Sequence, residues 1–300
     1  SRVDGIYKDP NFTRTSFYLH YGDVTDSLSV LNLIKKIKPD EIYNLAAQSH
    51  VKISFQIPEY TSDVNALGPL RLLEIIRHYK RKKIKFYQAS SSEMFGKSKP
   101  PQNEKTLFQP RSVYAISKVF AYHSVIHYRE AYGLYASNGI LFNHESPRRG
   151  VNFVTKKIVQ GLVRIKQGKQ KILSLGNLYS RRDWGHAKDY VESMWKILQY
   201  KNPDDFVIAT KTSHSVKDFI NICAKKLNIN LVWKNRGLKE VGINKLTKKT
   251  IIKVDKKYFR ETEVDDLIGD FTKARKLLKW KPKYSFNKLV DDMIYNELNG

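Results

Sequence analysis

The chain has a single cysteine, and this scarcity excludes two kinds of protein. Cys223 alone cannot form an internal disulfide framework, and it cannot supply the several thiolates of a cysteine-based zinc site. No apolar run approaches the roughly 20 residues that a membrane-spanning helix needs, and the first residues show no apolar signal-peptide segment. These absences predict a protein of the cytoplasm, with no metal site and no membrane contact.

Acidic residues are scarce relative to basic ones. The 300 residues include 54 lysines and arginines against 29 aspartates and glutamates, which gives a formal net charge of +25. Such an excess raises nucleic-acid binding as an alternative. The basic residues are spread along the whole chain, however, and no zinc-finger spacing or RNA-binding aromatic motif accompanies them. We therefore expect a protein that attracts small polyphosphates and binds no nucleic acid.

Short β-rich runs alternate with longer helical patterns in the first half of the chain. The pattern predicts strands at 17–21, 41–45, 85–89 and 136–142, and helices at 27–37, 63–79 and 113–132. This alternation is typical of an α/β fold with a doubly wound parallel sheet. In the second half, it predicts amphipathic helices at 215–227, 271–278 and 285–298, with a loop at 235–249. A smaller C-terminal lobe is therefore expected.

Tyr114 and Lys118 are the most informative pair of residues. Residues four apart on a helix lie on the same face, one turn from each other. A lysine ammonium beside a phenol favours the phenolate, so Lys118 is expected to lower the pKa of Tyr114 and make it a base. Most such pairs are merely solvated helix surface. The catalytic interpretation gains support because a predicted strand delivers Ser91 and Glu93 just before them, and open α/β sheets place their chemistry at strand ends.

Five sequence runs, in this order, carry a family resemblance. They are N-L-A-A-Q-S-H-V from Asn44, Y-Q-A-S-S-S-E from Tyr87, Y-x-x-x-K from Tyr114, N-G-I-L-F-N-H-E-S-P-R-R from Asn138 and R-R-D-W-G-H-A-K-D-Y from Arg181. In these runs the chain closely resembles the GDP-mannose 4,6-dehydratase family, which belongs to the extended short-chain dehydrogenases/reductases. The N-H-E-S-P-R-R run is specific to this family, whereas Y-x-x-x-K is common to the wider group.

The resemblance implies an arrangement of domains and sites. Residues 1–150 would form a Rossmann-like NADP-binding domain, residues 151–300 mainly a GDP-sugar-binding lobe, and 184–210 would return to the first domain. The implied catalytic residues are Ser91, Glu93, Tyr114 and Lys118. The implied contacts of NADP are Asp23, Val24, Leu45, Ala46, Ala47, Gln48, Ser49, Tyr60, Lys118, His144 and Arg149. The implied contacts of GDP-mannose are Ser49, Asn143, Lys157, Arg181, Arg260 and Glu263. A homo-oligomer, either a dimer or a tetramer, is also implied.

The implied reaction converts GDP-mannose to GDP-4-keto-6-deoxymannose. Tyr114 would take the proton of the C4 hydroxyl as hydride passes to NADP, and Glu93 would then remove the C5 proton. Water leaves from C6 with help from Ser91 and Glu93, and the hydride returns to C6, so the cofactor ends as it began. A simple reductase needs no acid at position 93. The family usually has Thr where this chain has Ser91, which keeps the hydroxyl and loses the stiffening methyl.

One family feature is missing from the sequence. A dinucleotide-binding fold opens with a strand, a glycine-rich turn and a helix, but neither G-x-G-x-x-G nor G-x-x-G-x-x-G occurs in the 300 residues. The first recognisable element, at 17–21, corresponds to the third strand of such a fold. Two interpretations follow. Either an N-terminal βαβ unit precedes the residues given, or the protein has lost NADP binding and is a non-catalytic nucleotide-sugar binder or assembly partner.

Overall fold

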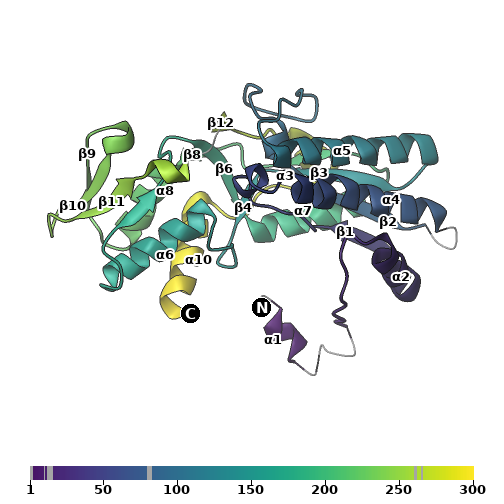
Figure 1. Ribbon diagram of the computed structural model, residues 1–300, viewed down its shortest axis with the longest axis horizontal. Helices are drawn as coiled ribbons and strands as arrows, with labels where there is room; N and C mark the ends of the chain where they lie inside the picture. The colour runs from purple at the N-terminus through teal and green to yellow at the C-terminus, as the bar shows by residue number, and fades with distance from the viewer. Residues whose placement is uncertain (1–2, 10, 12–15, 80–82, 260–261, 265) are drawn as a thin grey trace.

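The computed structural model describes residues 3–9, 11, 16–79, 83–259, 262–264 and 266–300. Its main element is a parallel sheet of four strands, in the order β1 (Glu41–Asn44), β2 (Lys85–Ser91), β3 (Ala136–Leu141) and β7 (Phe206–Ile208). All six residues of β3 are buried, as expected for a central strand with both faces covered. The predicted α/β fold is confirmed (Figure 1).

Helices cover both faces of this sheet. On one face lie α2 (Ser27–Ile37), α4 (Gly68–His78) and α5 (Val113–Tyr132), and on the other lie α7 (Ala187–Gln199) and α9 (Thr272–Leu277). Neighbouring side chains of β2 point to opposite faces, so Phe86 packs with α4 and α5 while Tyr87 packs with α7. Within residues 184–210, both β7 and α7 therefore lie with the parallel sheet.

The C-terminal lobe contains two smaller sheets. One has the order β5 (Leu173–Leu175), β11 (Thr250–Val254), β10 (Val241–Asn244) and β9 (Leu231–Lys234). The other joins β12 (Asp266–Leu267), β6 (Arg181–His186) and β4 (Asn143–Glu145), and β8 (Ser213–Ser215) pairs antiparallel with β6. The main helices of the lobe are α6 (Val154–Lys166), α8 (Val216–Lys226) and α10 (Phe286–Asn299). Figure 1 shows this lobe to the left of the parallel sheet.

Seven short helical segments complete the described chain. They are α1 (Asp4–Tyr7), α3 (Pro58–Ser62), η1 (Ile53–Phe55), η2 (Asp63–Leu67), η3 (Ser92–Met94), η4 (Gly237–Lys239) and η5 (Lys256–Tyr258). The segment η2 leads directly into α4, so the helix predicted at 63–79 begins with a wider turn.

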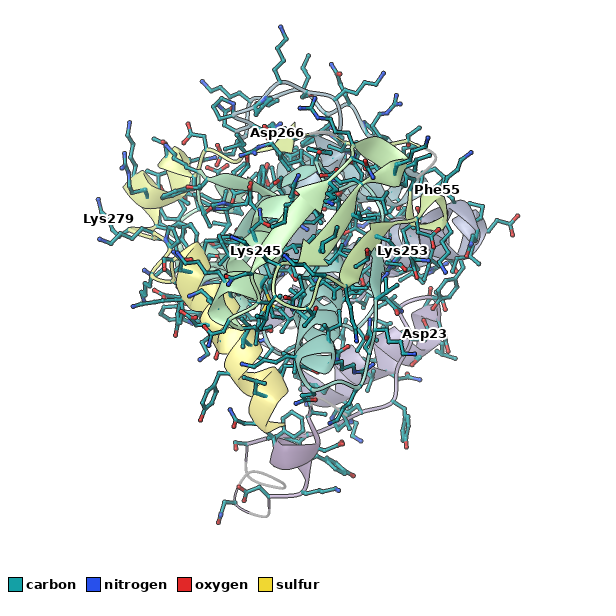
Figure 2. All side chains as sticks on the ribbon, turned by 90° about the vertical axis from the view of Figure 1, so that its left-hand side faces the viewer. Asp23, Phe55, Lys245, Lys253, Asp266 and Lys279 are labelled. Carbon is teal, nitrogen blue, oxygen red and sulfur yellow. The ribbon has the colours of Figure 1, made fainter. Side chains whose placement is uncertain are left out.

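Two predictions from the sequence are wrong. The strand predicted at 17–21 is absent: Phe17 forms only an isolated β-bridge, and residues 18–21 run as exposed chain, because a β-strand needs a hydrogen-bonded neighbour and none flanks residues 18–21 among the described residues. The loop expected at 235–249 contains β10, which pairs antiparallel with β9 and β11. The segment resembled a loop because its lysines lie outside β10, as Lys245 does in the turn that follows this strand (Figure 2). Trp233 of β9 and Ile252 of β11, which flank Gly242 of β10, pack against the core.

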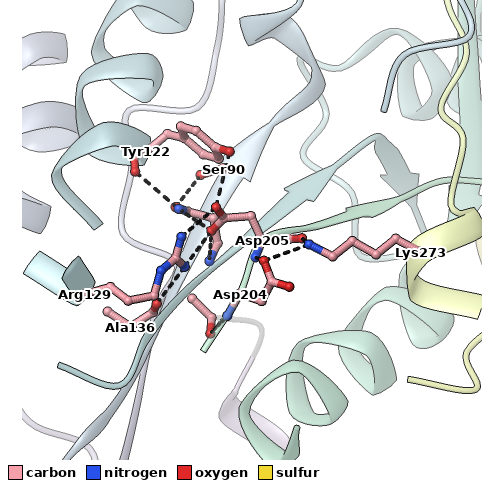
Figure 3. A network of polar contacts seen from close by, with 9 residues as sticks. Ser90, Tyr122, Arg129, Ala136, Asp204, Asp205 and Lys273 are labelled. Atoms are coloured by element: carbon pink, nitrogen blue, oxygen red, sulfur yellow. Dashed lines mark hydrogen bonds and ion pairs between the residues drawn. The ribbon is translucent and has the colours of Figure 1, made fainter. Parts of the chain in front are cut away.

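A buried polar network attaches α5 to the sheet (Figure 3). Asp205 lies just before β7, and its carboxylate accepts hydrogen bonds from two guanidinium nitrogens of Arg129 at 3.0 and 2.9 Å. The side-chain amide of Asn138, on β3, donates to the same carboxylate at 2.9 Å. The ammonium of Lys273, on α9, donates to the Asp205 carbonyl at 2.9 Å. Because α5 carries Tyr114 and Lys118, this network fixes the pair relative to the strand ends.

Replacing Asp205 with Asn is expected to lower the free energy of unfolding by about 3–5 kcal/mol. The substitution leaves the mostly buried Arg129 guanidinium without its counter-charge. Urea unfolding followed by circular dichroism measures the change. Asp291→Asn is the matched control, because its carboxylate is 58% exposed in its ion pair with Lys226, and the expected change is below about 1 kcal/mol. Equal changes in the two variants would contradict a special role for the network.

Candidate active site

A cavity of about 900 Å³ lies at the carboxyl ends of β1, β2 and β3. The carboxyl ends of parallel strands meet at one edge of a sheet, which is where open α/β folds form their sites. The cavity wall contains all four of the predicted catalytic residues, which are Ser91, Glu93, Tyr114 and Lys118. The fold therefore brings together side chains from the end of β2, from η3 and from the first turns of α5.

Local capping places these side chains. The hydroxyl of Ser112 accepts a hydrogen bond from the Ala115 N–H at 3.1 Å, which starts α5 two residues before Tyr114. Ser91 does the same for η3, where its Oγ accepts from the Glu93 N–H at 3.2 Å. Ser91 also hydrogen-bonds the phenol of Tyr114. One hydroxyl thus links the backbone of Glu93 to the hydroxyl of Tyr114.

The expected effect of Lys118 on Tyr114 is wrong for this structure. Tyr114 as a whole is half-buried, but its hydroxyl lies deep, and burial raises its pKa; the hydrogen bond from Ser91 and the charge of Arg149 act in the opposite direction. The Lys118 ammonium lies 5.9 Å from the centre of the Tyr114 ring and donates to the Ala89 carbonyl at 2.8 Å. Burial also lowers the pKa of Lys118 to about 8. Ser91 and Arg149 are therefore the groups that favour the phenolate here.

Glu93 has a cation beside it inside the cavity. The residue is 8% exposed, and its Oε1 lies 3.8 Å from Nε of Arg182. The Arg182 guanidinium also donates to the carbonyls of Arg181 and Val264, at 2.8 and 2.7 Å. These bonds hold the cation in place, so the largely buried Glu93 carboxylate has a fixed counter-charge beside it.

The C-terminal lobe supplies polar groups to the same cavity. The Lys157 ammonium lies 3.3 Å from the centre of the Tyr258 ring, and burial lowers the pKa of Lys157. Glu263 accepts a hydrogen bond from the Ser180 hydroxyl at 3.3 Å. Asn143 and Ser49 also line the wall. A lysine cation suits a diphosphate, and a carboxylate suits the N–H donors of a guanine base.

The structure divides the remaining predicted contacts into two sets. Those that line the cavity are Leu45, Ala47, Ser49, Lys118, His144 and Arg149. Those of the described residues that lie outside its wall are Asp23, Val24, Ala46, Gln48, Tyr60 and Arg181. Arg181 donates to the carbonyl and hydroxyl of Ser213, at 2.7 and 3.1 Å. The prediction for Arg260 falls on a residue outside the described part of the chain.

Comparison with known proteins decides the family. A sequence model of the family described as "GDP-mannose 4,6 dehydratase" matches residues 1–293. The chain is also 50% identical over 300 residues to the GDP-mannose 4,6 dehydratase of Homo sapiens, covering 99% of this chain and 81% of the human one. This chain belongs to the GDP-mannose 4,6-dehydratase family. The resemblance inferred from the sequence is confirmed.

Other relatives agree with this assignment. GDP-mannose 4,6 dehydratase 1 of Arabidopsis thaliana is 52% identical over 301 residues, which cover 99% of this chain and 79% of the plant protein. Among solved structures, RMD from Pseudomonas aeruginosa complexed with NADPH matches with a TM-score of 0.79 at 21% identity, covering 93% of this chain and 87% of that one. The dTDP-glucose 4,6-dehydratase of Bacillus anthracis in complex with NAD matches with a TM-score of 0.77 at 19% identity, covering 98% of this chain and 84% of that one. At these identities the two structures support the fold alone.

Four charged residues of the cavity wall were not predicted from the sequence, namely Lys52, Glu145, Arg182 and Lys257. Side chains alternate along a strand, so Arg181 and Arg182 of β6 point to opposite sides, and Arg182 is the one that lines the cavity. That alternation was the available signal. Glu145 also lines the wall, and its only signal was its place inside the N-H-E-S-P-R-R run.

The cavity wall fits one half of a nicotinamide dinucleotide. Leu45, Ala47 and Ser49 follow β1, and they lie in the same wall as Tyr114 and Lys118, so a nicotinamide and its ribose have apolar and hydrogen-bonding neighbours. Within the described chain, β1 is the end strand of the parallel sheet, and the sequence contains no glycine-rich turn for the pyrophosphate.

The described residues also contain no His, Cys, Asp or Glu cluster that could hold a metal ion, and no helix among them is long and apolar enough to cross a membrane.

Proposed function

We propose that this protein is a hydro-lyase that converts GDP-mannose to GDP-4-keto-6-deoxymannose, with NADP as its resident cofactor. The observation that supports this is the meeting of Tyr114 and Glu93 in one cavity, in a member of the GDP-mannose 4,6-dehydratase family. Oxidation of a sugar hydroxyl requires a proton acceptor such as Tyr114. Elimination of water requires a further base, and Glu93 is the carboxylate in place for it.

Tyr114 acts on the C4 hydroxyl of the mannose. Its phenolate accepts the hydroxyl proton, and the hydrogen bond from Ser91 and the charge of Arg149 favour this anionic form. When bound, NADP would supply the hydride acceptor for C4 and the hydride donor for C6. Lys118 would hold the nicotinamide ribose, and Leu45, Ala47, Ser49 and His144 would line the same half of the cofactor.

Glu93 acts on the elimination. A ketone at C4 makes the C5 proton acidic, and the Glu93 carboxylate removes it while Arg182 stays beside the carboxylate. The departing C6 hydroxyl then takes a proton from Glu93, with the Ser91 hydroxyl nearby to orient it, and leaves as water. Glu93 thus passes the C5 proton to the departing hydroxyl and ends this step as a carboxylate. After the hydride returns to C6, C5 takes up a proton and Tyr114 releases the one that it accepted from the C4 hydroxyl, so both residues end the reaction in their starting forms.

Residues of the C-terminal lobe would hold the GDP. The Lys157 ammonium would meet the diphosphate, Glu263 would accept hydrogen bonds from guanine, and Asn143 and Ser49 would contact the sugar side. The net charge of +25 favours the approach of such an anion from a distance. We also propose that the protein works in the cytoplasm as a homo-oligomer; the support is the family relationship and a single cysteine, Cys223, that is a buried free thiol.

The direct test is to incubate the purified protein with NADP and GDP-mannose. We expect mass spectrometry to detect a product that has lost one water from the sugar, with no net accumulation of NADPH, because the hydride returns to the product. Calorimetry with GDP and with NADP accompanies the assay. Binding of GDP without product and without NADP binding would overturn the proposal and indicate a non-catalytic nucleotide-sugar binder.

A further inference from the structure

Glu145 is a buried carboxylate to which the proposed reaction gives no role. It is the last residue of β4, it is 1% exposed, and yet it belongs to the cavity wall. A buried carboxylate is costly unless it is both paired and hydrogen-bonded. Glu145 has both kinds of partner: the Thr155 hydroxyl, from the first turn of α6, donates to its Oε2, and Nε of Arg149 lies 3.1 Å from the same oxygen.

Arg149 is held from two sides. Its guanidinium carbon lies 3.6 Å from the centre of the Phe153 ring, and the Glu145 carboxylate lies at its Nε. The Nε–H is not aligned well enough with that oxygen to form a hydrogen bond, so the contact is an ion pair. A long arginine side chain loses much rotamer freedom when it is fixed, so a fixed position depends on partners of this kind.

The charge of Arg149 acts on the catalytic cavity. Arg149 and Tyr114 line the same cavity. Burial raises the pKa of Tyr114, and the charge of Arg149 opposes this increase. The other ionisable groups around the phenol are Glu93, from η3, whose charge raises the same pKa, and Lys118, whose ammonium lies 5.9 Å from the ring centre. Burial lowers the pKa of the neighbouring His144, and Arg149 lowers it further while Glu145 raises it. A cation at this position therefore favours the anionic form of Tyr114.

We propose that Glu145 is a positioning residue, which holds the Arg149 guanidinium against Phe153 and so keeps its positive charge beside Tyr114. Thr155 orients the carboxylate for this task. Glu145 itself neither contacts substrate nor transfers a proton. The kinetic consequence rests on the proposed function, whereas the pairing of Glu145 with Arg149 does not.

The kinetic test compares Glu145→Gln, Arg149→Gln and the double variant. If Arg149 leaves its position, the pKa of Tyr114 rises, and the phenolate forms only at higher pH. We expect the rising limb of kcat/KM against pH to move up by roughly half a unit to one unit in Glu145→Gln. Arg149→Gln should move it in the same direction, and the double variant should move it no further than Arg149→Gln alone.

A matched control separates positioning from stability. Glu297 also pairs with a residue of α6, since its Oε2 lies 2.6 Å from Nζ of Lys156 in a largely buried ion pair. Glu297→Gln is expected to lower the melting temperature. The rising limb of kcat/KM against pH should stay at the same pH as in the unmodified protein. If Glu145→Gln does not fold, Thr155→Val replaces it, because that variant keeps both charges and removes one hydrogen bond; a smaller upward shift is then expected.

A readout without substrate or cofactor completes the test. NMR spectra of the arginine side-chain N–H groups assign Arg149 by the signal that Arg149→Gln loses. In Glu145→Gln this signal is expected to move and to exchange faster with water. The proposal would be overturned by an unchanged Arg149 signal in Glu145→Gln, or by a rising limb of kcat/KM that stays at the same pH or moves to lower pH. It would also be overturned if the shifts of the two single variants add up in the double variant. Absence of dehydratase activity in the unmodified protein would instead overturn the proposed function, and the NMR result would still decide the pairing.

Discussion

Replacing Glu93 with Gln is expected to separate the two halves of the proposed reaction. Oxidation at C4 depends on Tyr114 and Lys118, which the substitution leaves in place, whereas removal of the C5 proton needs a carboxylate. We expect formation of the dehydrated product to fall by about a hundred- to ten-thousand-fold. A single turnover with GDP-mannose should still reduce part of the NADP. Rapid-mixing absorbance detects the NADPH, and mass spectrometry detects the product.

Glu240→Gln is the matched control for this variant. Glu240 is also buried, at 1% exposure, and its Oε1 lies 2.6 Å from the ammonium of Lys217, but it lies outside the cavity wall. We expect this control to lose stability and to keep the unmodified ratio of NADPH to product. Normal product formation by Glu93→Gln would remove Glu93 from the mechanism.

Local signals were sufficient for the elements that surround the site. The helix α5 has the predicted bounds, 113–132, because Ser112 caps its start and Gly133 ends it in the left-handed conformation, with φ of 66°. The strand at 231–234 and the strands after it were missed for a tertiary reason. Short basic segments at 235–239 and 245–249 separate them, and only their pairing with one another and their packing on the lobe core distinguish them from a loop.

The sequence was sufficient to predict where the site lies, but not how its charges act on Tyr114. Strand order alone indicated that Ser91 and Glu93 would meet Tyr114 at one edge of the sheet. The pKa of Tyr114 depends instead on how deeply its hydroxyl is buried and on Arg149, which is 35 residues away along the chain. The spacing of Tyr114 and Lys118 contains no information on either, and it led to the wrong direction for that pKa.

Lys118→Met is expected to remove most of the activity and to stabilise the fold. Lys118 is 3% exposed, and burial lowers the pKa of its ammonium from 10.5 to about 8. In the unfolded chain the lysine keeps its ordinary pKa, so at pH 7 its buried charge costs the folded state roughly 3 kcal/mol. Methionine fills a similar volume without a charge, but it leaves the Ala89 carbonyl without its donor, which costs about 1–3 kcal/mol. The expected net gain in the free energy of unfolding at pH 7 is about 0–2 kcal/mol.

The pH dependence makes this prediction specific to the buried ammonium. Between pH 8 and 10.5 the folded protein has released the Lys118 proton while the unfolded chain still holds it, so the stability of the unmodified protein rises with pH in this window. The advantage of Lys118→Met should therefore be largest below pH 8 and should shrink as the pH approaches 10.5. Lys276→Met, at an exposed lysine of α9, should show neither the gain nor its pH dependence.

Urea unfolding across this pH range measures the stability, and activity assays at pH 7 measure the loss of function. A Lys118→Met protein that is less stable than the unmodified one at every pH would contradict the argument. A loss of activity of about a hundred-fold or more, together with a gain in stability, is the result expected of a buried charge that is present for function rather than for folding.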